Sequence, residues 1–83
     1  MVQYLYSLHD NKSGEWQAPV PDFNESTAKR NLAAGLRNTG DLRTFAPSDF
    51  ELYCVGTFDS SNGQVTSQFP EYICSCADLI ERK

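Results

Sequence analysis

The sequence is poor in the residue types on which most catalytic sites depend. Its 83 residues include a single histidine, His9. The chain contains no G-x-S-x-G elbow, no phosphate-binding P-loop, no H-E-x-x-H helix and no dinucleotide-binding fingerprint. Nucleophilic catalysis needs a nucleophile, a base and an orienting group within hydrogen-bond reach. We therefore expect a protein that is not an enzyme and that requires no cofactor.

Cysteine is also scarce, with three residues in the chain. Cys74 and Cys76 form one C-x-C, whereas zinc sites generally use four ligands at wider paired spacings. Cys54 and His9 could complete a ligand set on paper, but buried thiols more often act as small hydrophobic side chains. The sequence predicts no metal site and no disulfide framework, which is typical of a protein in a reducing, intracellular compartment.

Long apolar runs are missing as well. No stretch approaches the roughly 20 residues that span a bilayer, and the N-terminus lacks the charged and apolar regions of a signal peptide. We expect no contact with membranes. With 40% hydrophobic and 12% aromatic residues, the sequence predicts one globular domain over residues 1–83. The many aromatic residues favour a homodimer, which would cover those that lie on the surface.

The clearest structural pattern is a hairpin in the second half of the chain. Residues 50–58 alternate two sets of side chains with a period of two, which is typical of a strand. The turn that follows ends in Asn62-Gly63, which supplies the positive φ angles of a hairpin turn. Residues 64–69 form a second strand that Pro70 interrupts. One face of the first strand is expected to carry Phe50, Leu52, Cys54, Gly56 and Phe58.

A first hairpin is predicted at the N-terminus. Residues 2–9 alternate as a strand, and residues 10–14 are a cluster of turn residues. Residues 15–18 return as a short second strand, which residues 19–21 stop because proline cannot donate to a strand ladder. The first strand is expected to place Val2, Tyr4, Tyr6 and Leu8 on one face.

A helix is predicted between the two hairpins. Asn24 or Ser26 is the expected N-cap, and helix-forming residues fill positions 28–37. Residues 38–41 are expected to close the helix. The buried stripe, at helical spacing, consists of Ala28, Leu32, Gly35 with Leu36, and Thr39.

The C-terminal segment fits two structures. Ile73, Ala77 and Ile80 have helical spacing, while residues 72–74 would also suit a strand. A short helix is the preferred interpretation. The predicted fold class is α+β: a small antiparallel sheet of two hairpins in the order β-β-α-β-β, one helix packed on it, and a short C-terminal helical segment.

Acidic residues outnumber basic ones, but the basic residues are concentrated. The net charge of −4 and the isoelectric point near 4.7 argue against a protein that coats nucleic acid by charge alone. Within residues 29–43, however, Asp41 is the only acid. The basic residues of this segment are Lys29, Arg30, Arg37 and Arg43. We expect one local basic face on an otherwise acidic molecule.

Aromatic residues on the strands supply a second element of a nucleic-acid site. Rings that stack on unpaired bases, next to cations that contact phosphates, hold single strands without sequence preference. The rings available for this on the strands are Tyr4, Tyr6, Trp16, Tyr53 and Tyr72. The alternative is that these rings belong to the core or to a dimer interface, and that the cations form a solvated helix face. The candidate nucleic-acid-binding residues are Lys29, Arg30, Arg37, Arg43, Trp16 and Tyr6.

Several motifs are shared with a known family. They are Leu5-Tyr6-Ser7 followed by Asp10-x-Lys12, the entry Pro19–Phe23, the segment Ala28-x-Arg30-x-Leu32, and Asp49-Phe50-x-Leu52-Tyr53-x-x-Gly56-x-Phe58-Asp59. In these features, which cover nearly the whole chain, the sequence resembles the small nonstructural protein of gokushovirus-type microviruses, tailless bacteriophages with single-stranded DNA.

The resemblance implies a nonstructural phage protein in the host cytoplasm that binds single-stranded DNA and regulates the switch from genome replication to packaging. It supplies no catalytic residue, and Arg30 is the motif position suited to phosphate contact. The leading hypothesis is weak binding of single-stranded DNA through the helix at 24–38 and nearby aromatic residues. The alternative is a protein-interaction module that docks on phage replication or procapsid proteins, or on a host factor, without touching DNA.

Overall fold

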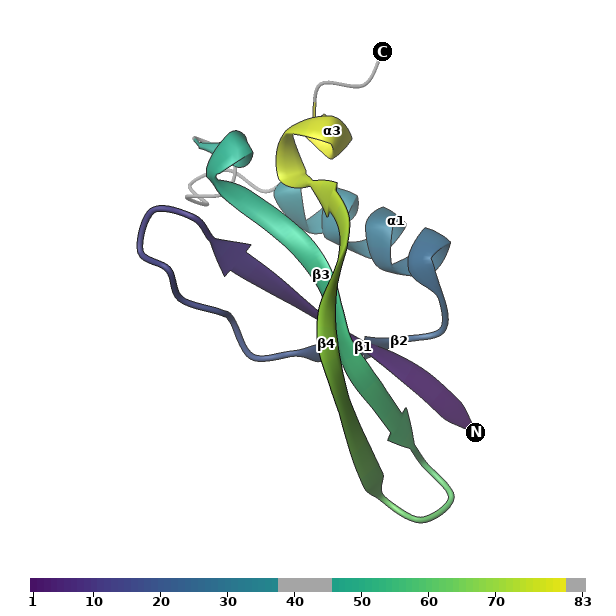
Figure 1. The fold of residues 1–83 in the computed structure, drawn as a ribbon. Helices are drawn as coiled ribbons and strands as arrows, with labels where there is room; N and C mark the ends of the chain where they lie inside the picture. Colours follow the sequence, from purple (N-terminus) through teal and green to yellow (C-terminus); the bar gives the residue numbers. More distant parts are fainter. Residues whose placement is uncertain (38–45, 81–83) are drawn as a thin grey trace.

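A computed structural model of the chain describes residues 1–37 and 46–80. Over these residues the chain forms a four-stranded antiparallel sheet with the strand order β2-β1-β3-β4, and both α-helices lie on one side of it (Figure 1). This confirms the α+β class and the order β-β-α-β-β. The elements are β1 (Val2–Asp10), β2 (Val20–Asp22), α1 (Glu25–Leu36), the 3₁₀ helix η1 (Pro47–Asp49), β3 (Phe50–Asp59), β4 (Gln64–Ser75) and α3 (Cys76–Ile80).

The helix α1 begins where the sequence provides a cap. Asn24 is the N-cap, and its side chain accepts a hydrogen bond of 2.9 Å from the backbone N–H of Thr27. The Thr27 hydroxyl in turn accepts from the backbone N–H of Asn24, which completes a capping box. Of the two predicted caps, Asn24 is therefore correct. The helix ends at Leu36, and the predicted closing residues 38–41 lie outside the described part of the chain.

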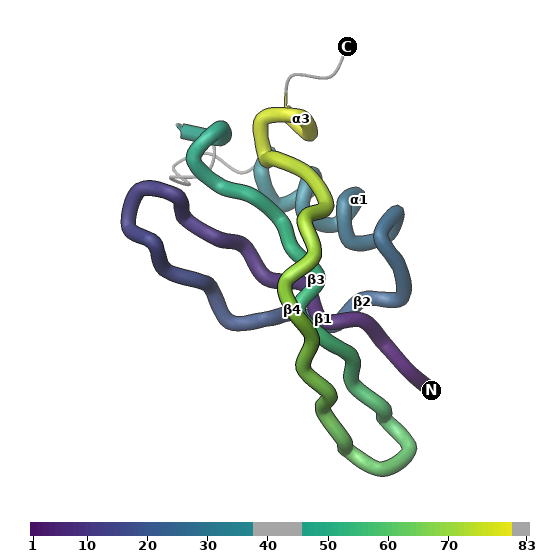
Figure 2. The backbone as a smooth tube through the Cα atoms, in the orientation of Figure 1, coloured from purple at the N-terminus to yellow at the C-terminus, as the bar shows by residue number. Residues whose placement is uncertain are grey.

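The hydrophobic core lies between α1, α3 and one face of the sheet. Cys76, at the start of α3, is completely buried in it, and Leu32 and Leu79 pack against its margin. Burial of this apolar surface is the main favourable contribution to folding. In Figures 1 and 2 the helices cover the upper part of the sheet, while the β3–β4 hairpin extends beyond them. The buried apolar residues are Tyr6, Leu8, Ala28, Leu36, Phe50, Leu52, Cys54, Cys74 and Cys76.

A bulge at Val55 changes the faces that were expected for β3. Cys54 pairs with Tyr6 and Gly56 pairs with Leu5, so Val55 is one extra residue in β3. Because one inserted residue reverses the alternation of side chains, residues after the bulge exchange faces with those before it. The predicted single face is correct from Phe50 to Cys54 and wrong beyond it, and Phe58 is only half-buried.

The strand β4 is longer and more irregular than predicted. It continues through Pro70 to Ser75, so the expected stop at that proline is wrong. Proline is tolerated there because β4 is an edge strand, and the pairing with β3 shifts next to it. Gln68, Phe69 and Pro70 stand opposite the single residue Val55. Phe69 is 92% exposed on this irregular stretch.

The second strand of the first hairpin lies later in the chain than predicted. Residues 15–18 contribute only an isolated bridge between Trp16 and His9. The three-residue strand β2 contains Pro21, which pairs with Leu5. The proline argument was wrong because β2 is the other edge of the sheet, where a residue without an N–H can face outwards.

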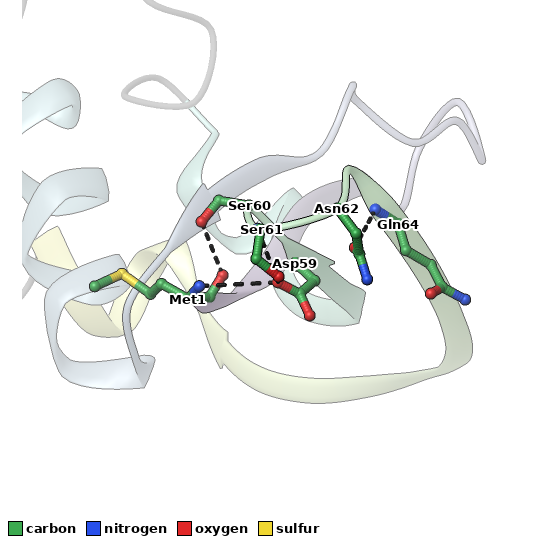
Figure 3. A network of polar contacts seen from close by, with 6 residues as sticks. All are labelled: Met1, Asp59, Ser60, Ser61, Asn62 and Gln64. Atoms are coloured by element: carbon green, nitrogen blue, oxygen red, sulfur yellow. Dashed lines mark hydrogen bonds and ion pairs between the residues drawn. The ribbon is translucent and has the colours of Figure 1, made fainter.

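The β3–β4 turn uses one left-handed residue instead of two. Gly63 has a φ of 75°, and no other residue between β3 and β4 has a positive φ. The Asp59 carboxylate accepts hydrogen bonds from the backbone and the hydroxyl of Ser61. The same carboxylate lies 3.8 Å from the amino group of Met1, which ties the start of β1 to this turn (Figure 3). The prediction of a hairpin is confirmed, and that of a positive φ at Asn62 is wrong.

The two readings of the C-terminal segment are each partly correct. Residues 71–75 complete β4, and the α-helix α3 occupies only Cys76–Ile80. The strand interpretation is correct before Cys76, where Tyr72, Cys74 and Ser75 pair with β3 and the register shifts at Ile73. Neither helix in the described part of the chain is long and apolar enough to cross a membrane.

Candidate nucleic-acid interface

The cations of α1 line one groove on the helix side of the molecule. The groove has a volume of about 820 Å³ and lies between α1 and α3. Its lining contains Lys29, Arg30 and Arg37, and no described acidic residue. Ser26, Ala33, Leu36, Leu79 and Ile80 complete the lining. We call this feature the cationic groove.

The three cations differ in how far nearby carboxylates neutralise them. The ammonium group of Lys29 lies 3.4 Å from the Glu25 carboxylate, one helical turn away. Exposed pairs of this kind contribute little and are screened by salt. Arg30 and Arg37 form no ion pair with any described carboxylate within 4.0 Å. Among the described residues, Arg30 and Arg37 are therefore without a carboxylate partner, and Lys29 has only a weak one that a phosphate can replace.

Arg30 lies near one acid that is already occupied by hydrogen bonds. The Asp22 carboxylate accepts from the hydroxyl of Thr27 at 2.6 Å, from the amide of Asn31 at 2.8 Å and from the backbone of Phe23. These bonds, that of Thr27 foremost, and the charge of Arg30 lower the pKa of Asp22 below its usual value. Asp22 thus faces the N-terminal part of α1, and it does not line the cationic groove.

Tyr6, one of the predicted binding residues, does not line this groove. Tyr6 is only 7% exposed and belongs to the core, so its ring faces are unavailable to bases. Burial, followed by the nearby Cys54, Glu25 and Asp22, raises the pKa of Tyr6 to about 12. Including Tyr6 in the interface was wrong, because its strand face is the one that α1 covers. Arg43 lies outside the described residues.

Trp16 lies on the other side of the sheet, in a cluster of four rings. Its ring centroid is 4.5 Å from that of His9 and 4.9 Å from that of Tyr53, and Tyr53 lies 5.7 Å from Tyr72. Ser7 pairs with Tyr53, and His9 pairs with Glu51. The pair between them, Leu8 and Leu52, is buried on the helix side, so His9 and Tyr53 lie on the opposite face of the sheet. We call His9, Trp16, Tyr53 and Tyr72 the aromatic row.

The predicted site therefore separates into two regions. Its described cations, Lys29, Arg30 and Arg37, line the cationic groove on the helix side, whereas Trp16 belongs to the aromatic row on the opposite face. One strand of nucleic acid cannot contact both in a single flat site, because the sheet lies between them. The period-two pattern already placed Glu51 and Tyr53 on the face opposite Leu52, and this signal could have located the aromatic row from the sequence.

The aromatic row is bordered by acidic groups. The Tyr53 hydroxyl donates a hydrogen bond of 3.2 Å to the Glu51 carboxylate. Burial, and after it the charge of Glu51, raises the pKa of Tyr53. Burial also raises the pKa of Tyr72, followed by the charges of Glu51 and Asp78. The Glu51 carboxylate is therefore in direct contact with the aromatic row.

The comparison with protein families decides the origin of the chain. The family described as Phage ORF5 protein matches residues 3–79, which is nearly the whole sequence. The chain belongs to the Phage ORF5 protein family. No curated protein and no solved structure matches it. The motifs that suggested a phage protein lie within this match, as do the whole aromatic row and every residue of the cationic groove except Ile80.

The cysteines of this ORF5-family protein are packed in its core. Cys54, Cys74 and Cys76 are all buried, and burial raises the pKa of Cys74. A thiol with a raised pKa is a poor nucleophile and a poor metal ligand at neutral pH. Across residues 1–37 and 46–80, no three His, Cys, Asp or Glu side chains lie together as a metal site would require. His9 lies in the aromatic row, with its Nδ1 2.8 Å from the side-chain oxygen of Asn11.

Proposed function

We propose that this phage protein is a non-enzymatic nonstructural protein of the gokushovirus type that binds single-stranded DNA through the cationic groove. The observation that carries the proposal is the composition of the groove lining. Lys29 and Arg30 from one turn of α1 line it together with Arg37, the C-cap of the helix, and none of the described residues that line it is acidic. A chain with a net charge of −4 thereby presents a local positive surface.

Phosphates are the groups that this groove suits best. Arginine and lysine contact phosphate oxygens, and such contacts carry no sequence information. The remaining described lining is aliphatic or small, since no aromatic side chain occurs in it. Because stacking on rings is absent there, we expect binding that depends on charge and is tolerant of sequence. The negative charge on the rest of the molecule weakens this binding further.

Weak, reversible binding fits a regulator of the replication cycle. The proposed role is to engage newly made single strands and favour their packaging over further replication. A protein that releases DNA readily does not compete with the capsid for the genome. Membership of a phage family and the motif position of Arg30 support this assignment.

The proposal predicts a specific salt dependence. Three phosphate contacts on a single strand give a slope of about −2 in a plot of log affinity against log salt, so affinity falls about twentyfold between 50 and 200 mM salt. Fluorescence anisotropy with labelled oligo(dT) measures this slope directly. Absence of binding at 50 mM salt would overturn the proposal and leave docking without DNA contact as the function to pursue.

Charge reversal in the groove provides the matched test. Arg30→Glu and Arg37→Glu each remove one phosphate contact, so each should weaken binding and reduce the salt slope by about 0.7. Lys12→Glu is the control, because it makes the same change of charge in the exposed turn after β1, outside the groove. Equal losses in Lys12→Glu and in the groove variants would contradict a localised site.

A further inference from the structure

The aromatic row is a surface that no helix or strand of the described residues covers. Both helices pack on the opposite face of the sheet, where Cys76 and Leu79 of α3 and Ala28 and Leu36 of α1 contact the core. Trp16 is 44% exposed and Tyr72 is 51% exposed. These side chains cross the sheet from the segment beside β1 to the edge strand β4. Exposed rings in contact with one another are a common feature of protein interaction sites.

The charge around this surface indicates what it binds. Glu51 is hydrogen-bonded to Tyr53, and Asp78 lies close enough to act on Tyr72. Among the described lysine and arginine side chains, three line the cationic groove, Lys12 lies in the turn after β1, and none forms an ion pair with Glu51 or Asp78. The aromatic row thus combines electron-rich ring faces with carboxylates, and both attract a cation.

We propose that the aromatic row is a docking surface for an arginine-bearing, extended segment of a partner protein. A guanidinium group is planar, so it can stack on a tyrosine or tryptophan ring while its N–H groups donate to a carboxylate such as that of Glu51. An extended segment suits the site, since an extended chain can lie across an open sheet face with alternate side chains directed towards the rings. This surface is separate from the cationic groove, and the proposal does not depend on DNA binding.

Other occupants fit the chemistry less well. Nucleic acid would bring phosphates next to Glu51 and Asp78, which costs electrostatic energy. A purely apolar partner would leave the Glu51 carboxylate without a cation in a desolvated interface. A cationic segment satisfies both the rings and the acids.

The test uses tryptophan fluorescence, because Trp16 is the only tryptophan in the chain. We expect a saturable change in Trp16 emission when the full-length protein is titrated with a synthetic peptide of alternating arginine and glycine. A peptide of alternating glutamate and glycine, and oligo(dT), should cause no saturable change. Removing one ring or one charge should weaken peptide binding about two- to fivefold, as in Tyr72→Ala and Glu51→Gln.

A matched variant separates docking from general attraction to an acidic protein. Glu71→Gln removes the same charge from β4, but Glu71 pairs with the core residue Cys54 and so lies on the opposite face from Tyr72. Unchanged binding in Glu71→Gln, with weaker binding in Glu51→Gln, supports the proposal. Equal weakening in both variants would overturn it. A saturable change in Trp16 emission with oligo(dT) would also overturn it, because the face would then bind DNA. So would a change in emission with protein concentration in the absence of peptide, because the face would then bind a second copy of the chain.

Discussion

The two sides of the sheet show opposite chemistry built from the same strands. On the helix side, α1 covers an apolar core and presents cations to solvent along a groove. On the open side, Trp16 and Tyr72 are half exposed, and the Glu51 carboxylate lies beside Tyr53. Neighbouring residues on β3, such as Leu52 and Tyr53, serve these two sides alternately. The net charge of the chain therefore does not predict the local charge of either side, and the two sides suit different partners.

The largest expected difference between the sides is in stability. Leu52 is buried on the helix side, so Leu52→Ala should lower the free energy of unfolding by about 2 to 5 kcal/mol. Tyr72 is half exposed on the open side, and Tyr72→Ala should cost about 1 kcal/mol. Urea unfolding followed by circular dichroism measures both. Similar losses in the two variants would show that the open side is as much a structural core as the helix side.

A second test concerns the bulge that changes the faces of β3. A Cβ atom at Gly56 would collide with the carbonyl oxygen of Thr66 on β4 and would lie 3.3 Å from the Cα of Ser67. Gly56→Ala should therefore destabilise the protein by about 1 to 3 kcal/mol. Gly35→Ala is the control, because no described atom lies within 4 Å of its Cβ and alanine favours a helix by about 0.5 to 1 kcal/mol. A Gly56→Ala variant as stable as the parent would refute the close approach of β3 and β4.

The smallest effect is expected where β2 joins the helix side. Hydrogen bonds from Thr27, Phe23 and Asn31 lower the pKa of Asp22 in the folded protein. The stability that they contribute is present above the unfolded pKa near 3.8, and it is lost as pH falls through the lower, folded value. Asp22→Asn should cost about 1 kcal/mol at pH 7 and make stability less dependent on pH below about 4. Thermal unfolding at a series of pH values measures this.

An acid on the opposite edge strand of the sheet provides the control for this titration. Glu71 is an exposed residue of β4. Glu71→Gln should therefore leave the loss of stability at acid pH unchanged. If the stability of Asp22→Asn falls as steeply at acid pH as that of the parent, other carboxylates are responsible for the decrease. Asp10 and Asp59, whose pKa values are also lowered by hydrogen bonds, would be the next to examine.

Local patterns were sufficient to predict the fold class and the helix. The alternation in residues 2–9 and 50–54, the cap at Asn24 and the turn glycine Gly63 each depend on residues that are close in sequence. Each of them appears in the structure as expected. The cations of α1 were also expected to lie away from the buried stripe of the helix, and Lys29, Arg30 and Arg37 do so.

The errors came from relations between strands. The bulge at Val55, the continuation of β4 through Pro70 and the position of β2 depend on pairing with a neighbouring strand, which a single-chain pattern does not encode. Tyr6 and Trp16 show the same difficulty. Tyr6 belongs to β1, and Trp16 forms a bridge to it. Helix α1 packs on only one face of the sheet, so it covers Tyr6 and leaves Trp16 uncovered. Dividing the predicted interface between two faces required the tertiary structure.

The irregular course of β4 has a consequence for the protein at high concentration. A straight, regular outer strand invites a second molecule to continue the sheet, and growth of this kind leads to fibres. At Gln68–Pro70 the outer strand departs from regular pairing, and Pro70 offers no N–H to an incoming chain. Both features disfavour edge-to-edge pairing between crowded copies, even though β4 is the longest strand in the sheet.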